Sequence, residues 1–199
     1  MAPELAPEDA FRTKASILAE FSKIIVIGTG FFHQDEQKKI HFRVKTFTGE
    51  SEQEVLLAFK KLVEERFDQK KLAFVAHNGR DFDFPCLCRR LLINGLSLPK
   101  SLQLLDKKPW EVPHHDTMQM WRFGESRHYV SLELLSAIFD IPSSKTDIDG
   151  SQVSQLYHEE GQLARIADYC AEDVIATAQV FLRMNNLPLV PLEQITRVE

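Results

Sequence analysis

The apolar run Ile24–Phe32 constrains the fold of this chain more than any other segment. Its β-branched and aromatic side chains fall on both faces of an extended chain. A strand that is apolar on both faces is covered on both sides, as in layered α/β domains. The run is far shorter than the roughly 20 residues that a membrane span needs. It therefore predicts a strand inside a covered sheet.

The segments that follow complete an α/β pattern. Residues 40–46 alternate apolar and polar side chains, which predicts a half-exposed strand that pairs as a hairpin with the run before it. Ser51 and Glu54 have capping-box spacing, so a helix is expected to begin there. The predicted order is strands at 24–32 and 40–46, a helix at 51–67, a strand at 72–76, a helix ending near 94–95, a strand at 115–121, helices at 131–139, 152–159 and 162–185, and an irregular tail at 187–199.

Size and charge narrow the class of protein. The 199 residues correspond to a single domain, 1–199, at roughly 150 residues per domain. With 24 Lys and Arg against 29 Asp and Glu, the net charge is −5, so contact with nucleic acid requires a local basic patch or bound cations. The start of the chain lacks the features of a secretory signal, and the three cysteines lack metal-ligand spacing. We expect reduced thiols, a cytoplasmic location and no membrane segment.

Two carboxylates stand out by their context. Asp83 lies just past the strand 72–76, where open α/β sheets place their sites, and Asn78 is suited to brace the intervening turn. Asp83 is equally placed to act as the N-cap of the following helix. Asp173 and Tyr169 have i, i+4 spacing, which puts them on one face of the helix 162–185, at the edge of its apolar stripe. The alternative for Asp173 is a solvated carboxylate beside a partly buried tyrosine.

The order of these residues is more informative than either carboxylate alone. Asn78-x-x-x-Phe82-Asp83 after a strand, followed by Tyr169-x-x-x-Asp173 on a late helix, resembles the second and third exonuclease motifs of the DEDD superfamily with a tyrosine in the last motif. From about residue 7 to 182 the chain looks like the predicted 3′–5′ exonucleases related to the proofreading domain of family B DNA polymerases. The further segments that carry this resemblance are 19–24, 88–95, 108–112, 115–118 and 149–153.

The resemblance implies an α/β, ribonuclease H-like mixed β-sheet flanked by helices. It also implies hydrolysis of the terminal phosphodiester at a nucleic acid 3′ end, with single-stranded DNA favoured, by two divalent cations, Mg²⁺ or Mn²⁺. By position, Asp83 and Asp173 are the metal ligands. Tyr169 orients the attacking water, because a phenol suits hydrogen bonding better than full proton abstraction. Asn78 and Phe82 support the site.

One motif of the family is absent. Its first motif is Asp-x-Glu on the first strand, and no Asp-x-Glu occurs in these 199 residues. Residues 8–24 instead resemble the family's segment between the first and second strands. We therefore expect a sheet that lacks the first strand, whether through truncation, a late start or genuine loss, and a chain without nuclease activity of its own. The alternative function is a non-catalytic, ribonuclease H-like nucleic-acid-binding module.

Other patterns have weaker functional interpretations. His115–Asp116 occurs in metal-dependent HD phosphohydrolases, but those proteins are all-helical, whereas a strand is expected here. Gly28–Gly30 lacks the spacing of a dinucleotide loop and is more simply a kink in a strand. An interaction domain unrelated to nucleic acid is disfavoured by the order of motifs. The remaining candidates for nucleic-acid contact are aromatic residues and paired cations, which more often pack in loops or form solvated faces: Trp110, Trp121, Tyr129, Lys107–Lys108 and Arg89–Arg90.

Overall fold

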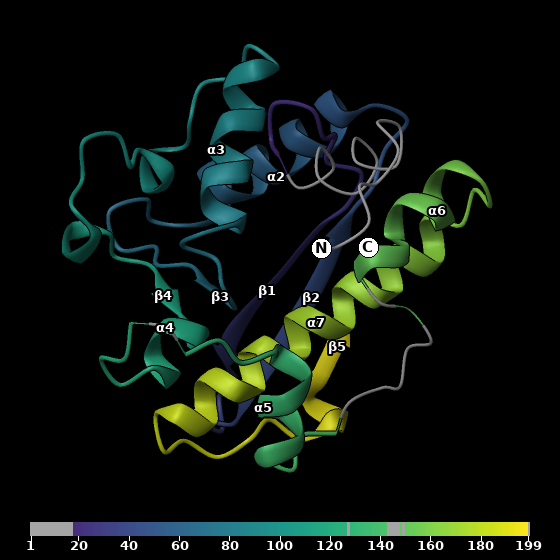
Figure 1. Cartoon of the computed structure of the whole chain (residues 1–199). Helices are drawn as coiled ribbons and strands as arrows, with labels where there is room; N and C mark the ends of the chain where they lie inside the picture. The colour runs from purple at the N-terminus through teal and green to yellow at the C-terminus, as the bar shows by residue number, and fades with distance from the viewer. Residues whose placement is uncertain (1–17, 127, 143–147, 149, 199) are drawn as a thin grey trace, which may run out of the picture.

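The computed structural model describes residues 18–126, 128–142, 148 and 150–198. The chain forms a mixed α/β arrangement with strands in its middle and helices packed against them (Figure 1). The strands are β1 (Ile27–Gln34), β2 (Ile40–Phe47), β3 (Val75–Ala76), β4 (His115–Asp116) and β5 (Ile195–Arg197). The α-helices are α2 (Glu52–Arg66), α3 (Asp83–Ile93), α4 (Thr117–Trp121), α5 (Leu132–Ile138), α6 (Val153–His158) and α7 (Leu163–Met184). Short 3₁₀ turns lie at Lys100–Leu102, Pro109–Glu111, Gly150–Gln152 and Leu192–Gln194.

The strands form two separate sheets. In the first, β1 and β2 pair antiparallel from Ile27 opposite Phe47 to Gln34 opposite Ile40, which confirms the predicted hairpin. β5 adds to the other edge of β2 in parallel. The second sheet is β3 paired in parallel with β4. Within the described residues, β1 and β3 do not pair with each other, although α7 packs against both. Each sheet therefore turns an unpaired edge toward the other.

The glycines of β1 set how closely this strand approaches its neighbours. A Cβ added at Gly28 would lie 2.7 Å from Cys170 Sγ and 2.8 Å from Val174 Cγ2, so only glycine lets β1 lie this close to α7. Gly30 lies in the same way against the ring of Phe42. β1 is continuous through both residues. The expected kink at this position was wrong, because the glycines make room for packing instead of bending the strand.

Apolar side chains of the strands pack against helices on two sides. One core cluster joins β2 to α7 and the C-terminal segment; its buried members are Phe42, Val44, Ala171, Ile175, Ala178, Leu182 and Val190. Another lies beneath α2 and α3; its buried members are Phe47, Val55, Leu56, Phe59, Val63, Leu91 and Leu102. α7 also contacts α4, α5 and α6, so this helix organises the C-terminal half of the domain. None of the described helices combines the length and apolar character that a bilayer crossing needs.

The helix predictions agree well with the structure. Ser51 is the N-cap of α2, and its hydroxyl accepts a hydrogen bond from the Glu54 N–H at 3.2 Å, as the capping-box spacing predicted. α3 ends before Asn94, and Gly95 follows with φ +71°. The helices expected at 131–139, 152–159 and 162–185 correspond to α5, α6 and α7. The periodic spacing of apolar residues is the signal that made these helices predictable, and among the three only α5 also has a side-chain cap, Ser131.

Several strand predictions need correction. The expected strand 115–121 is only β4, because the Asp116 carboxylate accepts the N–H groups of Met118 and Gln119 and so starts α4. The tail at 187–199 contains β5, whose Ile195 packs on the β2–α7 cluster. The other two strands are displaced or shorter than expected: β1 begins at Ile27 and β3 comprises Val75–Ala76.

Candidate active site

Asp83 is the first residue of α3, at the end of the loop that leaves β3. The N-cap position is occupied by Phe82, and no side chain caps the helix there, so the alternative of Asp83 as N-cap was wrong. Its carboxylate is open to solvent at the positive end of the α3 dipole. Phe82, the expected supporting residue beside it, is exposed as well. The carboxylate thus stands at the end of a strand with access for a ligand.

The loop that carries Asp83 is fixed by Asp116, a residue that sequence reasoning did not include in the site. Asp116 is 2% exposed, and four backbone N–H groups donate to its carboxylate. Asn78 N–H and Arg80 N–H donate to Oδ1 and Oδ2, each at 3.0 Å. The other two donors, Met118 and Gln119, belong to α4. One buried side chain therefore joins the 78–82 loop to β4 and α4.

Asn78 supports the site through its backbone. It has φ +64°, a left-handed conformation that Asn tolerates better than most residues. Its N–H donates to Asp116, and its carbonyl accepts the Phe82 N–H at 3.0 Å. These two bonds set the direction in which the chain enters α3. The supporting position predicted for Asn78 is thus in the loop that orients Asp83.

Tyr169 and Asp173 lie on one face of α7, as their spacing predicted. Both side chains are half-buried, and the Tyr169 hydroxyl donates a hydrogen bond to the Asp173 carboxylate. The fully buried stripe of α7 runs one position further along than the predicted row; it consists of Ile166, Ala171, Ile175, Ala178, Gln179, Val180 and Leu182. Asp173 consequently sits at the edge of the packed face, where α7 meets the strands.

Electrostatics show that Asp83 and Asp173 share one environment. Although Asp83 is exposed, the protein atoms packed around it partly desolvate its carboxylate, which raises the pKa of Asp83 to about 6, and the negative charges of Asp116 and Asp173 add to the effect. Burial also raises the pKa of Asp173, as does the charge of Glu172, while the bond from Tyr169 opposes the shift. Within the described residues, neither Asp83 nor Asp173 has an ion-pair partner. Two carboxylates that lack cationic partners, one of which feels the charge of the other, are suited to attract a cation.

His115–Asp116 does not form the site of an HD phosphohydrolase. The ring of His115 packs against Phe181 with centroids 5.3 Å apart. The Asp116 carboxylate is occupied by backbone N–H groups, as described above. This pair therefore acts in positioning the backbone.

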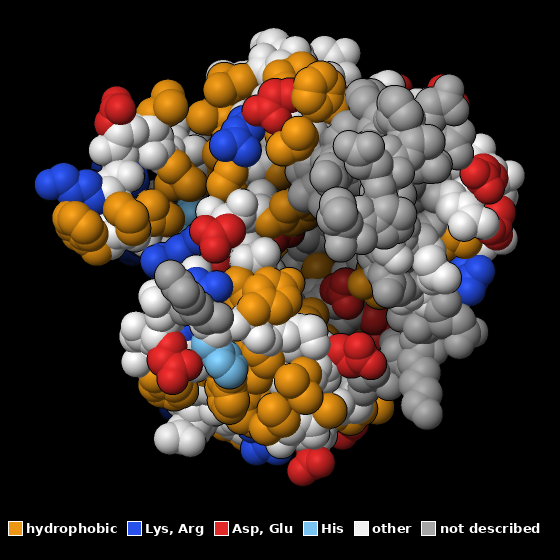
Figure 2. Space-filling model, viewed as in Figure 1, with side chains coloured by type: hydrophobic (Ala, Val, Ile, Leu, Met, Phe, Trp, Pro, Cys, Tyr) orange, Lys and Arg blue, Asp and Glu red, His pale blue; other side chains and the backbone are white. Residues whose placement is uncertain are grey.

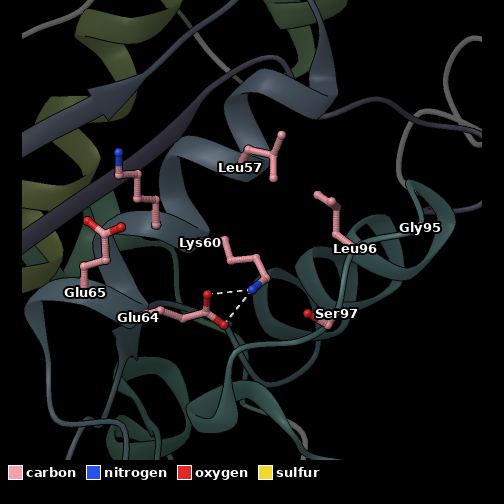
Figure 3. A pocket seen from close by; sticks show the side chains of 8 residues that line it. Leu57, Lys60, Glu64, Glu65, Gly95, Leu96 and Ser97 are labelled. Atoms are coloured by element: carbon pink, nitrogen blue, oxygen red, sulfur yellow. Dashed lines mark hydrogen bonds and ion pairs between the residues drawn. The ribbon is translucent and has the colours of Figure 1, made fainter.

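The clearest pocket in the described part of the molecule lies elsewhere (Figure 3). It is formed by α2 and the loop after α3, and Lys60 and Glu64 form an ion pair of 2.6 Å at its wall. The remaining lining residues are Leu57, Lys61, Glu65, Gly95, Leu96 and Ser97. It contains neither Asp83 nor Asp173, and its charges neutralise one another. The candidate site therefore remains the pair of carboxylates at β3 and α7.

A comparison with protein families decides the classification. Residues 17–189 match the model of a family described as predicted 3′–5′ exonucleases related to the exonuclease domain of PolB. The chain belongs to this family. The match covers most of the chain and confirms the resemblance seen in its motifs. A search of curated proteins found no match.

The chemistry of the two carboxylates can be compared with the cations that such an exonuclease family typically uses. The carboxylates of Asp83 and Asp173 are the hard oxygen ligands that Mg²⁺ and Mn²⁺ prefer, and their raised pKa values reflect charge that a cation would relieve. Within the described residues, no group of three or more His, Cys, Asp or Glu side chains is placed to hold a metal ion. The residue type of Asp83 and Asp173 is thus compatible with such cations, whereas two carboxylates alone do not make up a complete set of ligands.

Proposed function

We propose that this exonuclease domain acts on the 3′ end of a nucleic acid, with single-stranded DNA as the favoured substrate, and removes terminal nucleotides by hydrolysis. The observation that carries the proposal is the pairing of Asp83 with Asp173. Asp83 and Asp173 lie 90 residues apart in the chain, yet the charge of Asp173 contributes, after burial and beside Asp116, to the raised pKa of Asp83. Neither carboxylate has an ion-pair partner among the described residues. Family membership gives the reaction class.

In this proposal Asp83 and Asp173 hold divalent cations, Mg²⁺ or Mn²⁺. Two such ions, when bound, stabilise the attacking and leaving oxygens of the phosphodiester. Tyr169 holds the attacking water by hydrogen bonding, since its hydroxyl already lies at the Asp173 carboxylate. Asn78 orients the loop, and Phe82 lies exposed beside Asp83, where it supports the terminal nucleotide.

We further propose that the 199 residues alone do not catalyse hydrolysis. The sequence contains no Asp-x-Glu, and two carboxylates are fewer than the four that the family's mechanism uses. Within the described residues β1 and β3 do not pair, which leaves a gap in the hydrogen bonding between them. The strand β3 leads into the loop before Asp83, and α7, which carries Asp173, packs against both strands. A strand in this gap would be placed to supply the other two acids. The free thiols of Cys86, Cys88 and Cys170 fit a reducing cytoplasm.

The test is a 3′-nucleotide release assay on a 5′-labelled single-stranded oligonucleotide in Mn²⁺. The purified 199-residue chain is expected to release no nucleotide. A form of the protein that contains an Asp-x-Glu strand is expected to be active, and its Asp173→Asn variant to lose about 100-fold or more of that activity. Tyr169→Phe is expected to lower kcat while Mn²⁺ affinity stays nearly unchanged.

Two outcomes would overturn parts of this proposal. Release by the 199-residue chain that Asp83→Asn abolishes would show that two acids suffice. Binding of a single strand without hydrolysis, in every form of the protein, would favour the non-catalytic binding module. Measuring Mn²⁺ binding by electron paramagnetic resonance in Asp83→Asn and Asp173→Asn separates loss of metal from loss of folding.

A further inference from the structure

The most exposed large apolar side chains gather in one segment. Within the described residues they are Phe123, Trp110, Leu105 and Tyr129, which are 88%, 77%, 76% and 69% exposed. All four fall within residues 105–129, and three are aromatic. The exposure of Trp110 and Tyr129 shows that the packing expected for these two residues was wrong. Trp121 does pack, with its ring against that of Phe139. Burying such side chains is favourable, so a cluster of exposed ones indicates a binding surface.

Cations accompany these aromatic rings. Lys108 Nζ lies 5.4 Å from the centroid of the Trp110 ring. Arg122 directly precedes Phe123, and its Nε donates to the His128 carbonyl at 2.8 Å, next to Tyr129. Lys107, Lys108 and Arg122 form no ion pair with any carboxylate of the described residues. The same segment also carries acidic residues, among them Asp106, Glu111 and Glu125, so it is not basic overall. What it offers to phosphate groups is three cations that no described carboxylate engages.

The loop after α4 holds Phe123 in an unusual conformation. Its φ is +47°, which bulky side chains rarely adopt, and Gly124 follows with φ +95°. The bond from Arg122 to His128 closes this loop. Trp121 lies beneath, with its ring centroid 6.3 Å from that of Phe123. The loop therefore combines a strained backbone with an apolar ring that is exposed to solvent, a combination that is typical of functional positions.

This segment is attached to the candidate active site. The Pro109–Glu111 turn and the loop after α4 project from the same edge of the molecule, at the left of Figure 1, on either side of β4. Figure 2 shows the surface hollowed at this edge, with Lys or Arg and apolar side chains around the hollow. Asp116 ties α4 to the loop of Asp83, and Gln119 Nε2 lies 3.4 Å from Asp81 Oδ2.

We propose that residues 105–126, 128 and 129 form a docking edge for single-stranded nucleic acid. Bases stack on the rings of Trp110, Phe123 and Tyr129, and phosphates lie against Lys107, Lys108 and Arg122. A duplex does not offer its base faces for stacking, whereas a single strand offers both bases for the exposed rings and phosphates for the unpaired cations, so a single strand fits this surface best. The direction of the strand toward Asp83 rests on the proposed function, but binding to the edge requires neither metal nor hydrolysis.

The test measures fluorescence anisotropy of a labelled oligothymidylate with the whole chain in EDTA, where no hydrolysis occurs. Trp110→Ala and Phe123→Ala are each expected to weaken binding by about 5- to 150-fold. Leu192→Ala removes a similarly exposed side chain outside the edge and is the matched control, with affinity expected within twofold. Lys108→Ala is expected to reduce the slope of log Kd against the logarithm of the salt concentration by about 1.

The outcomes separate this proposal from the proposed function. Unchanged affinity in both Trp110→Ala and Phe123→Ala, or a duplex that binds as tightly as the single strand, overturns the docking edge. A third result would also overturn it: a chain that binds no oligonucleotide but self-associates, with the self-association abolished by Trp110→Ala. The surface would then serve a protein contact. Loss of nucleotide release in Asp83→Asn and Asp173→Asn tests the proposed function, whereas anisotropy in EDTA tests the edge, so the two proposals can fail separately.

Discussion

Arg90 and Glu52 form a buried ion pair across 38 residues of sequence, with Arg90 Nε 2.8 Å from Glu52 Oε1. Arg90 also donates through Nη1 to the carbonyl of Ala19 at 2.9 Å. Glu52 accepts the backbone N–H of Ile24 at 2.8 Å, and its pKa is lowered by the hydrogen bond from Arg90 despite burial. The pair therefore joins α2 and α3 to the segment that leads into β1.

Breaking this pair is expected to be costly. Arg90→Met leaves the Glu52 carboxylate buried without its partner and should lower the free energy of unfolding by about 3–5 kcal/mol in urea titrations. Arg89→Met is the control, because Arg89 is exposed and its Nε lies 3.9 Å from Glu20. That change should cost less than about 1 kcal/mol. Equal losses in the two variants would mean that the ion pair is not a stabilising link.

Asp116→Asn places an amide group where backbone N–H groups now donate. At least one donor loses its acceptor, so the free energy of unfolding should fall by about 1–3 kcal/mol. Amide hydrogen exchange at Asn78 and Arg80 should accelerate in the same variant. Ser131→Ala removes the N-cap of α5 and should cost about 0.5–2 kcal/mol without affecting those two amides. An unaltered exchange rate at Asn78 would argue against positioning of the loop by Asp116.

The pKa of Asp83 predicts how stability depends on pH. In the folded protein this pKa is raised to about 6, so between pH ~4 and ~6 the folded state keeps a proton that the unfolded chain has lost. The contribution of Asp83 to stability therefore falls as pH rises through this window, and the full penalty is present above it. In the absence of divalent metals, Asp83→Asn should raise the melting temperature at pH 7 and flatten the profile. Asp81→Asn, in the same loop, is the control and should leave the slope unchanged.

The close contact between β1 and α7 makes Gly28 sensitive to substitution. Gly28→Ala forces a methyl group against Cys170 and Val174 and should lower the free energy of unfolding by about 1–3 kcal/mol. A Cβ added at Gly150 meets no atom of the described residues within 4 Å, so Gly150→Ala is expected to be nearly neutral. Thermal unfolding of the two variants measures the difference. A tolerated Gly28→Ala would show that α7 has freedom to move away from the strand.

Local chemistry explains which parts of the fold were predictable. Ser51 with Glu54 and the apolar spacing of α7 are encoded by neighbouring residues, so these helices were found from sequence. Asp83, Tyr169 and Asp173 were predicted as site residues because their spacing resembles the motifs of a known family. The family comparison confirms membership of that family. Their roles in metal binding and catalysis stay predictions.

Features that depend on distant partners were missed. Asp116 precedes Thr, Met and Gln, a pattern that signals a helix start, but its bonds to Asn78 and Arg80 come from residues 36 to 38 positions away. β5 is three residues long and is defined by the free edge of β2, not by its own sequence. The exposure of Trp110 was likewise unpredictable, because aromatic residues are more often packed than exposed.

The unpaired edges of β1 and β3 also have a consequence for handling the protein at high concentration. Backbone groups at such edges are templates for strands of other molecules, and here they lie in the middle of the domain, not at its periphery. Two copies that insert strands between the unpaired edges of β1 and β3 would form a domain-swapped dimer and not only a surface contact. Aggregates formed in this way would resist dilution, and a short strand-forming peptide that occupies the opening would act as a solubilising agent.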